Sequence, residues 1–525
     1  MNCFAYSDYA VGRSNYTLYF LISVCVAYSI NDMLSLSEHR SIKKMLPALS
    51  VYSCYIVFWM ILSYRNGFQH KVLFFLFLIL FVLAACLFFW AGKIRKSCGG
   101  MGAAFLCFAS FMACGYLGYY ERLSEYFVDL DIYDEIKNSA YGRHSEEDQS
   151  RDALRTDIID TKNMAALILG NPGTYSYFSI QNDSLYDFFR DMTCSCSIYG
   201  GNVQMRTLDG RRSLEMLMGV GTYSEDEDGT ILHDNNDLRL PLGFTYDSYA
   251  LNSDVAQLDS LSKSTAVLDT VYLDSVPDID VPKVELEEIE NNNSYEIVPV
   301  EISYPSSMTD EGIMAVDSYD IIDISLSREN MELDESSEYY LYFESIETDR
   351  DWGSIDINQM KKMRFSSAGE ASNEKGEYLA RIPINDEIKK SGHITLGVSK
   401  GNYKFGTIEI RKVDTSDYAT RREELINDSL EDIKFTPNSI SGRITCENDK
   451  LLFVSLLFDK RWKCFVDGDS QKLLLADSGF TAIELTEGTH DVMFKYDCTL
   501  NILSAIVSLL SIIVVIAWMK KDVGK

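Results

Sequence analysis

The sequence carries little positive charge for its length. Its 525 residues hold 48 Lys and Arg against 78 Asp and Glu, which gives a formal net charge of −30. So acidic a surface repels nucleic acids and anionic lipids, which argues against both as ligands. It can attract cations such as Ca²⁺, although an acidic surface that is merely solvated accounts for the same composition.

Common catalytic and metal-binding motifs are missing as well. The sequence has no P-loop, no GxSxG elbow, no HExxH motif and no dinucleotide fingerprint. The acidic run EDEDG at 225–229 lacks the spaced ligands and the closing Glu of an EF-hand. No cofactor is therefore evident from the sequence motifs.

Cysteine is present but is not spaced as in a zinc or redox site. Of the 12 cysteines, five lie beyond the N-terminal apolar region: Cys194, Cys196, Cys446, Cys464 and Cys498. Cys194 and Cys196 alternate as in a strand and do not form a CxxC motif. Cys446 and Cys464 either pair across strands in an oxidising compartment or act as small buried hydrophobic residues.

Acidic residues are scarce only at the N-terminus. The first 120 residues hold Asp8, Asp32 and Glu38 beside nine Lys and Arg, whereas residues 121–498 hold 74 Asp and Glu against 36 Lys and Arg. About 20 apolar residues are needed to cross a bilayer. Segments of this kind are expected at about 16–34, 46–64, 72–92, 100–120 and 499–519.

Basic residues mark the expected cytoplasmic ends of these segments. The loops EHRSIKK and KIRKS and the tail KKDVGK at 520–525 fall on one side of the membrane if the crossings alternate. This orientation places residues 121–498 outside the cell. We therefore expect a multi-pass protein of the cell membrane with a cytoplasmic tail and a large extracellular region, and the lipid bilayer is its first expected partner.

Two kinds of pattern divide the extracellular region at about residue 250. Residues 121–250 predict an α+β domain, in which Ser184 or Asp183 caps a helix with Leu185, Phe188, Phe189 and Met192 on one face. Residues 211–224 predict a short helix that leads into a strand. From 251 to 498, short alternating runs between turn signals predict β-sandwich, jelly-roll-like domains, with a further helix at about 416–431.

The last strands of the extracellular region are the most regular. The run RWKCFVDGD contains Asp467-Gly468, a strong hairpin signal, and further turns are expected at Ser478-Gly479 and Glu487-Gly488. Two alternating sets of residues each share a face, and we expect these faces to close a small sandwich core. The sets are Trp462, Cys464 and Val466, and Val492, Phe494 and Tyr496.

This tail, followed at once by an apolar helix, resembles the C-terminal end of the bacterial YfhO family. The matching positions are Trp462, Asp467, Gly468, Gly488, His490 and Tyr496. An upstream block resembles the family at Arg155, Asn163, Gly170, Tyr177, Ser179 and Asn182. The segments SLEMLMGV and LPLGFTY agree with it too, so the resemblance covers roughly residues 100–520.

The resemblance implies a function in building the cell envelope. Family members look like polytopic glycosyltransferases of the GT-C type, which transfer a sugar from a polyprenyl-phosphate donor to an envelope polymer. In such enzymes a carboxylate of the first outer loop acts as a base or binds a divalent cation near the phosphate. Here the first outer loop, SYRNGFQHK, has no acid. We therefore expect the C-terminal portion of such an enzyme, with a separate N-terminal membrane half as a partner, and leave open whether the chain is itself an enzyme.

Few residues qualify as site candidates, and each has a plainer interpretation. Asp8 is a catalytic candidate as the only acid before the first apolar segment, or is simply solvated. Tyr177, Ser179 and Asn182 can line an acceptor groove or form a structural turn. Trp462 can stack on a sugar or belong to the core. His490 is expected to be a packed or hydrogen-bonded strand residue rather than a catalytic one.

The alternative function is a non-catalytic one. The same architecture suits a surface carbohydrate-binding or envelope-assembly protein held in the membrane. The two hypotheses share the expected fold, a multi-pass α-helical membrane protein whose extracellular α+β region ends in β-sandwich domains. No metal ligands are assigned under either hypothesis.

Overall fold

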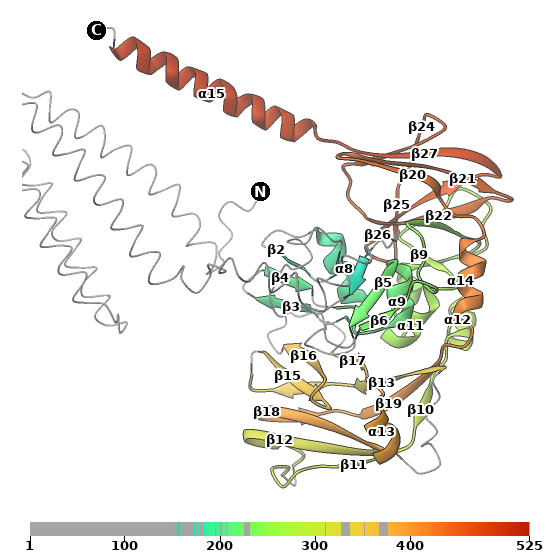
Figure 1. The fold of residues 1–525 in the computed structure, drawn as a ribbon, viewed down its shortest axis with the longest axis vertical. Helices are drawn as coiled ribbons and strands as arrows, with labels where there is room; N and C mark the ends of the chain where they lie inside the picture. Colours follow the sequence, from blue (N-terminus) through green and yellow to red (C-terminus); the bar gives the residue numbers. More distant parts are fainter. Residues whose placement is uncertain are drawn as a thin grey trace, which may run out of the picture. The chain divides into compact units, whose positions relative to one another are not determined.

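The computed structural model describes most of the second half of the chain and parts of the region before it. The described residues are 155–157, 173–174, 176–178, 182–194, 196–199, 202–205, 207–224, 232–309, 311–326, 336–350, 352–366 and 376–523. All of them belong to one compact unit, Tyr133–Lys525. The four spans expected before residue 121, and Asp8, lie outside the described residues. The described part is an α+β structure with many antiparallel sheets (Figure 1).

A six-stranded central sheet lies between two other layers. Its strand order is β7 (Gly243–Tyr246), β22 (Lys450–Leu457), β26 (Phe480–Leu485), β25 (Leu474–Ala476), β9 (Val271–Leu273) and β8 (Tyr249–Leu251). Helices cover one face: α8 (Asp183–Asp191), α9 (Arg212–Leu217), α10 (Asn252–Val255), α11 (Ser260–Ala266), α12 (Leu286–Asn292) and α14 (Tyr418–Ile426). Strands from both sides of residue 250 share this sheet, so the change in sequence pattern there does not coincide with a boundary between sheets.

The other face of the central sheet packs against a five-stranded C-terminal sheet. Its order is β20 (Glu431–Thr436), β21 (Ser439–Cys446), β27 (Gly488–Tyr496), β23 (Trp462–Val466) and β24 (Asp469–Gln471). Strand β22 lies between two cores because its side chains alternate. Leu451 and Phe453 join the helices, while Leu452 and Val454 join the C-terminal sheet. The apolar run LLFV at 451–454 is therefore that of a strand buried on both faces.

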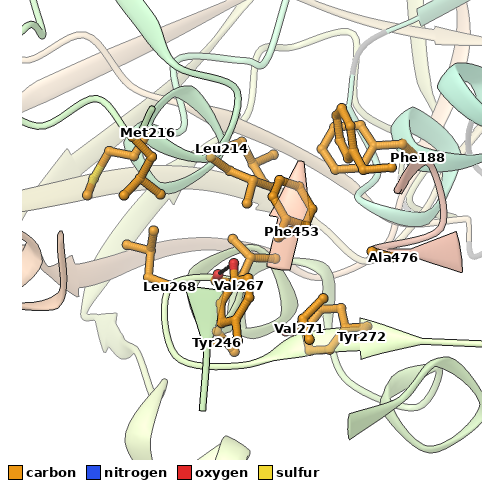
Figure 2. Close-up of a cluster of buried hydrophobic side chains, with 14 of the residues drawn as sticks. Phe188, Leu214, Met216, Tyr246, Val267, Leu268, Val271, Tyr272, Phe453 and Ala476 are labelled. Atoms are coloured by element: carbon orange, nitrogen blue, oxygen red, sulfur yellow. Dashed lines mark hydrogen bonds between the residues drawn. The ribbon is translucent and has the colours of Figure 1, made fainter. Parts of the chain in front are cut away.

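Aromatic rings fill the core on the helical side. Phe453 packs against Phe244 and Phe480, with ring centroids 5.1 and 5.5 Å away. Figure 2 shows Phe453 between Leu214 of α9 and the residues of the central sheet. The helix expected from Asp183 or Ser184 is present as α8, and Phe188 and Phe189 of its predicted apolar face are buried. Its cap, however, is Asn182, whose side chain accepts a hydrogen bond from the Ser184 amide.

Residues 296–414 form a β-sandwich inserted between the strands of the central sheet. The inner sandwich sheet has the order β10 (Glu296–Val298), β19 (Ile408–Asp414), β13 (Ser337–Phe343) and β17 (Tyr378–Arg381). The outer sandwich sheet has the order β11 (Val300–Ser303), β12 (Met314–Leu326), β18 (His393–Phe405), β15 (Trp352–Ile357) and β16 (Lys361–Ser366), and β14 (Ile346–Thr348) pairs with β18. Helix α13 (Asp386–Ser391) leads into β18. The two sheets enclose one core of buried apolar residues.

Two small sheets complete the α+β part. One consists of β1 (Arg155–Asp157), β5 (Val220–Ser224) and β6 (Leu232–Asp234), and the other of β2 (Ser176–Phe178), β4 (Asn202–Met205) and β3 (Cys196–Tyr199). Helix α9 runs directly into β5, as residues 211–224 predicted. Arg155 anchors β1 because its guanidinium donates to the Met218 and Ser455 carbonyl oxygens, both at 2.6 Å.

The expected pairing of the tail strands needs a correction. Trp462, Cys464 and Val466 lie directly opposite Tyr496, Phe494 and Val492 on the neighbouring strand. Opposite residues of adjacent strands point to the same side, so the two sets form one face of one sheet. The facing layer is the central sheet, which contributes Leu452, Val454, Ile483 and Leu485. Cys446 and Cys464 are free and buried, which confirms their interpretation as small buried residues.

The hairpin between β23 and β24 turns at Asp467-Gly468, as predicted. Both residues have positive φ, 52° and 91°, as a tight two-residue hairpin requires. An alanine Cβ at Gly468 would meet no atom within 4 Å.

Gly468→Ala should therefore act through the backbone alone and lower the free energy of unfolding by about 1–2 kcal/mol. Gly468→Asn should cost less, since Asn tolerates this conformation better. Urea unfolding of the full chain in detergent measures both, with the exposed Ser470→Ala as the control. Equal stability of the alanine and asparagine variants would contradict the backbone explanation.

A long helix follows the C-terminal sheet after two residues. Strand β27 ends at Tyr496, and α15 (Thr499–Val523) begins with the Thr499 amide donating to Asp497. Large apolar side chains are exposed along α15, among them Leu500, Val507 and Ile513. Within the described residues, no helix reaches the length and apolarity needed to cross a membrane. The C-terminal span expected at 499–519 therefore stays a prediction.

Candidate functional site

One face of the inner sandwich sheet lines the sandwich core, and the opposite face packs against the helical layer. The contact with the helical layer is largely polar. Apolar residues supply a small core of Leu261, Tyr340, Leu379 and Val413. Around it lies a group of ionisable side chains that we call the ionic junction. Its members are Asp157, Asp209, Arg212, Glu215, Glu338, Lys361 and Arg381, contributed by β1, the turn before α9, α9 itself, β13, β16 and β17.

Glu338 lies at the centre of the ionic junction and is 1% exposed. Its Oε1 is 3.4 Å from Nε of Arg381 and 3.6 Å from Nε of Arg212, and its Oε2 accepts a hydrogen bond from the Tyr340 hydroxyl at 2.7 Å. Burial opposes the charge on Arg381, but Glu338, Tyr223 and Glu215 together raise the pKa of Arg381 above its ordinary value. Arg381 therefore stays charged, and the contacts of Glu338 join β13 and β17 to α9.

Arg381 also forms hydrogen bonds with two uncharged groups of the opposite layer. Its Nη1 donates to the Gly210 carbonyl oxygen at 3.3 Å and to the Tyr223 hydroxyl at 3.4 Å. Nearby, Nζ of Lys361 donates to the Asp209 carbonyl oxygen at 2.6 Å. Gly210 permits these approaches because its φ is +70° and a Cβ there would lie 3.1 Å from Nζ of Lys361.

Two further carboxyl groups are buried beside these cations. Asp157 accepts hydrogen bonds from the Thr174 hydroxyl and, at 3.1 Å, from the Leu208 amide, but burial still raises its pKa to about 6. Glu215 is fully buried, and neither of its carboxyl oxygens has a hydrogen-bond partner among the described residues. Burial, and then the charge of Asp157, raise the pKa of Glu215 to about 8. Glu215 is therefore mostly protonated at neutral pH.

A small pocket opens beside the ionic junction. It is lined by Gly210, Tyr223, Ser224, Lys361, Arg381 and Pro383. Its ammonium, guanidinium and hydroxyl groups suit a water molecule or a small anion. No cluster of His, Cys, Asp or Glu able to hold a metal ion occurs among the described residues. Chemically, the ionic junction can hold two layers in fixed register and bind or release protons.

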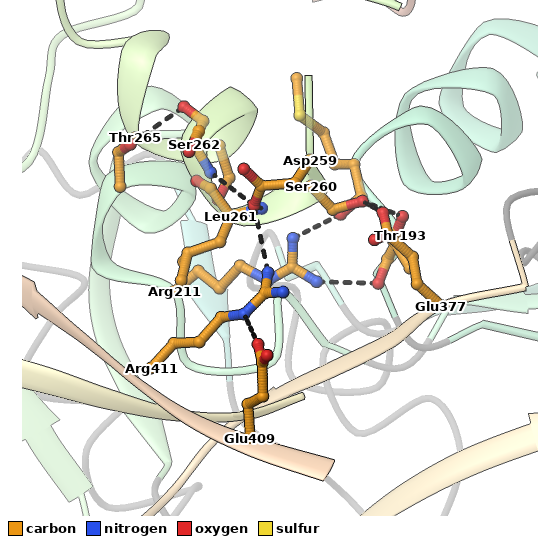
Figure 3. A network of polar contacts seen from close by, with 12 residues as sticks. Thr193, Arg211, Asp259, Ser260, Leu261, Ser262, Thr265, Glu377, Glu409 and Arg411 are labelled. Carbon is orange, nitrogen blue, oxygen red and sulfur yellow. Dashed lines mark hydrogen bonds and ion pairs between the residues drawn. The ribbon is translucent and has the colours of Figure 1, made fainter. Parts of the chain in front are cut away.

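A second polar network continues the same contact (Figure 3). Arg411 of β19 lies 3.4 Å from Asp259 at the start of α11 and donates to Glu409 at 2.9 Å. The fully buried Arg211 donates to the Met192 and Thr193 carbonyl oxygens, and Ser260 donates to Glu377. Buried charges paired in this way define one arrangement of the layers, because any shift leaves a charge without its partner.

The residues predicted as candidates lie elsewhere and do not come together in one site. Tyr177 is in β2, paired with Gln204, and Ser179 and Asp8 fall outside the described residues. Asn182 caps α8 and also donates to the Phe458 carbonyl oxygen at 3.4 Å. The structure gives Asn182 a capping contact at the start of α8, and the acceptor groove stays a prediction.

Trp462 and His490 are both held by the C-terminal sheet. Trp462 is half-buried against its core, and its ring meets Tyr496 edge-on with centroids 5.0 Å apart. His490 contacts the Asp467 carboxylate at 2.7 Å and the Thr486 carbonyl oxygen at 3.0 Å. These contacts bind β27 to the hairpin turn, as expected of a hydrogen-bonded strand residue.

Sequence reasoning missed the ionic junction because its members are up to 224 positions apart, from Asp157 to Arg381. One local signal was available. Glu215 stands in SLEMLMGV among Leu214, Met216 and Leu217, all buried. A charged residue directly flanked by buried apolar residues in a short helix indicates a buried, specifically placed carboxyl group.

Comparison with known proteins places the chain in a family. The model of the "Bacterial membrane protein YfhO" family matches residues 9–508. The chain belongs to the YfhO family. A YfhO relative from Bacillus subtilis (strain 168), described as an uncharacterized protein, is 19% identical over 538 residues, covering 97% of this chain and 60% of the relative. This YfhO chain thus spans about 60% of the length of that relative.

Two solved structures share only remote likeness with this YfhO protein. The mycobacterial arabinofuranosyltransferase AftD matches 38% of the chain and 25% of its own length, with 8% identity and a TM-score of 0.14. A cupin 2 conserved barrel domain protein from Leptotrichia buccalis matches 40% of the chain and 94% of its own length, with 14% identity and a TM-score of 0.09. Values this low carry no argument about fold or function.

Proposed function

We propose that this YfhO protein is a multi-pass membrane protein that takes part in glycosylation of the cell envelope. Its extracellular lobe, residues 121–498, positions an envelope polymer beside the membrane, where a polyprenyl-phosphate-linked sugar is transferred. Membership of a bacterial membrane-protein family over residues 9–508 supports the membrane location. The sugar-transfer step rests on the likeness of the YfhO family to GT-C glycosyltransferases.

The observation that carries the proposal is the direct connection between β27 and α15. Only Asp497 and Cys498 separate the C-terminal sheet from a helix whose apolar side chains are exposed. Burying those side chains in lipid would remove a large unfavourable exposure to water. With so short a tether, a membrane-embedded α15 would hold the C-terminal sheet next to the bilayer surface.

The ionic junction supports a positioning function for the lobe. Positioning requires that the layers keep a fixed arrangement, and buried paired charges favour one arrangement over its neighbours. Here the Glu338 pairs link the inner sandwich sheet to α9, and the Arg411 pairs link it to α11. A lobe built in this way can present a polymer at a constant distance from the membrane.

Deleting the gene tests the proposal. We expect loss of one sugar from the envelope polymer and build-up of its lipid-linked donor, measured by glycan composition analysis and lipid extraction. Expression of the full chain should restore both, and protease treatment of intact cells should cleave within residues 121–498. An unchanged glycan together with unchanged donor levels would overturn the sugar-transfer part of the proposal.

The same experiment distinguishes sugar transfer from the alternative function, that of a non-catalytic carbohydrate-binding or envelope-assembly protein. In that case deletion would leave the sugar composition intact, while the purified full chain would still retain the envelope polymer on a column. Protection of residues 121–498 from protease in intact cells would contradict both functions, because both need an extracellular lobe.

A further inference from the structure

Basic side chains on the outward face of the C-terminal sheet gather at one end of its strands. Near the end where β27 runs into α15, the outward-facing side chains include Lys434 on β20, Lys463 on β23 and Lys495 on β27. All three are exposed. Toward the other end, the same surface carries Asp491, which pairs with Arg443. This net-acidic chain therefore gathers lysines where its last sheet meets the apolar helix.

The loop before β23 extends this basic end of the sheet. Lys460 and Arg461 are exposed there, and the Arg461 guanidinium stacks over the Tyr496 ring at 4.7 Å. Asp459 holds Arg461 at 2.8 Å, and Asp497 holds Lys463 at 3.0 Å. We name Lys434, Lys460, Arg461, Lys463 and Lys495 the basic rim; these five basic side chains meet two carboxylates.

The arrangement of the basic rim is unfavourable for the isolated sheet. Lys463 and Lys495 lie directly opposite each other on adjacent strands, and like charges in that position destabilise a sheet. Asp497 compensates Lys463 alone, and no described residue forms an ion pair with Lys495 or Lys434. An anionic partner outside the chain would relieve this repulsion.

Aromatic residues accompany the basic rim. Phe435 of the edge strand β20 is 63% exposed although it is fully apolar. Trp462 and Tyr496 form an edge-on pair at the ends of β23 and β27, just before α15. Aromatic and basic side chains flanking an apolar helix are typical of the zone where a protein meets lipid headgroups.

We propose that the basic rim docks on the anionic phospholipid headgroups around α15 and so fixes the tilt of the extracellular lobe on the membrane. The inference rests on the proposed function in one respect, namely that α15 lies in the bilayer. Charge complementarity and the two-residue connection to α15 identify the occupant. Phe435 follows Lys434 in β20 and so points to the opposite face of the sheet from the lysines, which leaves the docking to the basic side chains.

The acidity of the rest of the lobe does not oppose this docking. A strand rises about 3.3 Å per residue, so Asp491 lies about 13 Å along β27 from Lys495. Charges this far apart are screened at physiological ionic strength, where the Debye length is about 8 Å. The headgroups therefore interact with the basic rim and only weakly with the acidic end.

Lysine labelling of the full chain in lipid nanodiscs tests the inference. Lys434, Lys463 and Lys495 should react about fivefold more slowly with an amine-modifying reagent in discs containing phosphatidylglycerol than in discs of phosphatidylcholine alone, because each lysine is drawn to the anionic surface. Lys400 and Lys404, exposed on β18 in the outer sandwich sheet, should react equally in both. The difference should vanish in about 1 M salt, where the Debye length is about 3 Å.

A charge-reversed variant provides the matched comparison. In K434E/K463E/K495E the reporter Lys460 should lose its lipid-dependent protection, whereas K390E/K400E/K404E should keep it. Resistance of the protein to alkaline extraction from membranes is measured in parallel. If the protein is extracted, the membrane location in the proposed function fails; if it stays embedded but labelling is the same in both discs, only the docking of the basic rim is overturned.

Discussion

Replacing Arg381 by methionine should lower the free energy of unfolding by about 3–5 kcal/mol, because it leaves a buried carboxylate short of its partner. Methionine keeps most of the aliphatic stem but removes the charge 3.4 Å from Glu338 and the donor to Gly210 and Tyr223. The remaining partner, Arg212, is 3.6 Å away. Pulse proteolysis of the full chain across a urea series measures the change.

Two comparisons identify the buried charge as the cause. Arg443→Met removes an arginine from a pair whose side chains are 58% and 68% exposed, and it should change the free energy of unfolding far less than Arg381→Met does, because solvent screens the exposed pair. Adding Glu338→Gln to Arg381→Met should restore part of the loss, because no carboxylate is then left buried without compensation. Equal shifts for Arg381→Met and Arg443→Met would contradict this explanation.

Raising the pH from about 5 to 8.5 should destabilise the lobe, and Glu215→Gln should remove much of that loss. Burial raises the pKa of Glu215 to about 8, of Asp477 to about 7 and of Asp157 to about 6. The folded state then holds protons that the unfolded state releases above about pH 4, so stability falls as pH rises toward the folded pKa. For Glu215 the loss is on the order of a few kcal/mol.

Glu215→Gln should therefore be close to wild type at pH 5 and more stable than wild type at pH 8.5. Thermal unfolding of the full chain in detergent across this range measures the effect. Asp477→Asn should behave in the same direction, since asparagine keeps the oxygen that accepts from the Tyr272 amide at 2.9 Å. The exposed Glu301→Gln is the control and should leave the pH profile unchanged. A parallel profile for Glu215→Gln and wild type would mean that Glu215 is already ionised in the folded state.

Several elements could be read from the sequence because their signals are local. The cap region and apolar face of α8, the helix-to-strand run at 211–224 and the Asp467-Gly468 turn each depend on residues within one or two turns of chain. The helix expected at about 416–431 is present but shorter, Tyr418–Ile426.

The candidate site could not be read in this way. Glu338, Arg381 and Glu215 are separated by long stretches of chain, and none stands in a motif that names its partner. Pairing in the sheets also depends on distant strands. The sequence places Trp462 and Tyr496 on separate faces. Alternation shows which residues of one strand share a face, but it does not show which strand lies next to it.

By itself, the sequence determined the local elements, the apolar segments, the acidity of the region between them and the likeness to YfhO proteins, because each of these depends on neighbouring residues or on composition. Only the tertiary structure decided that residues 296–414 form an inserted sandwich, that Glu338 meets Arg212 and Arg381 across two layers, and that scattered basic residues form the basic rim. These features arise from contacts between distant residues, and a contact of that kind depends on how the whole chain packs.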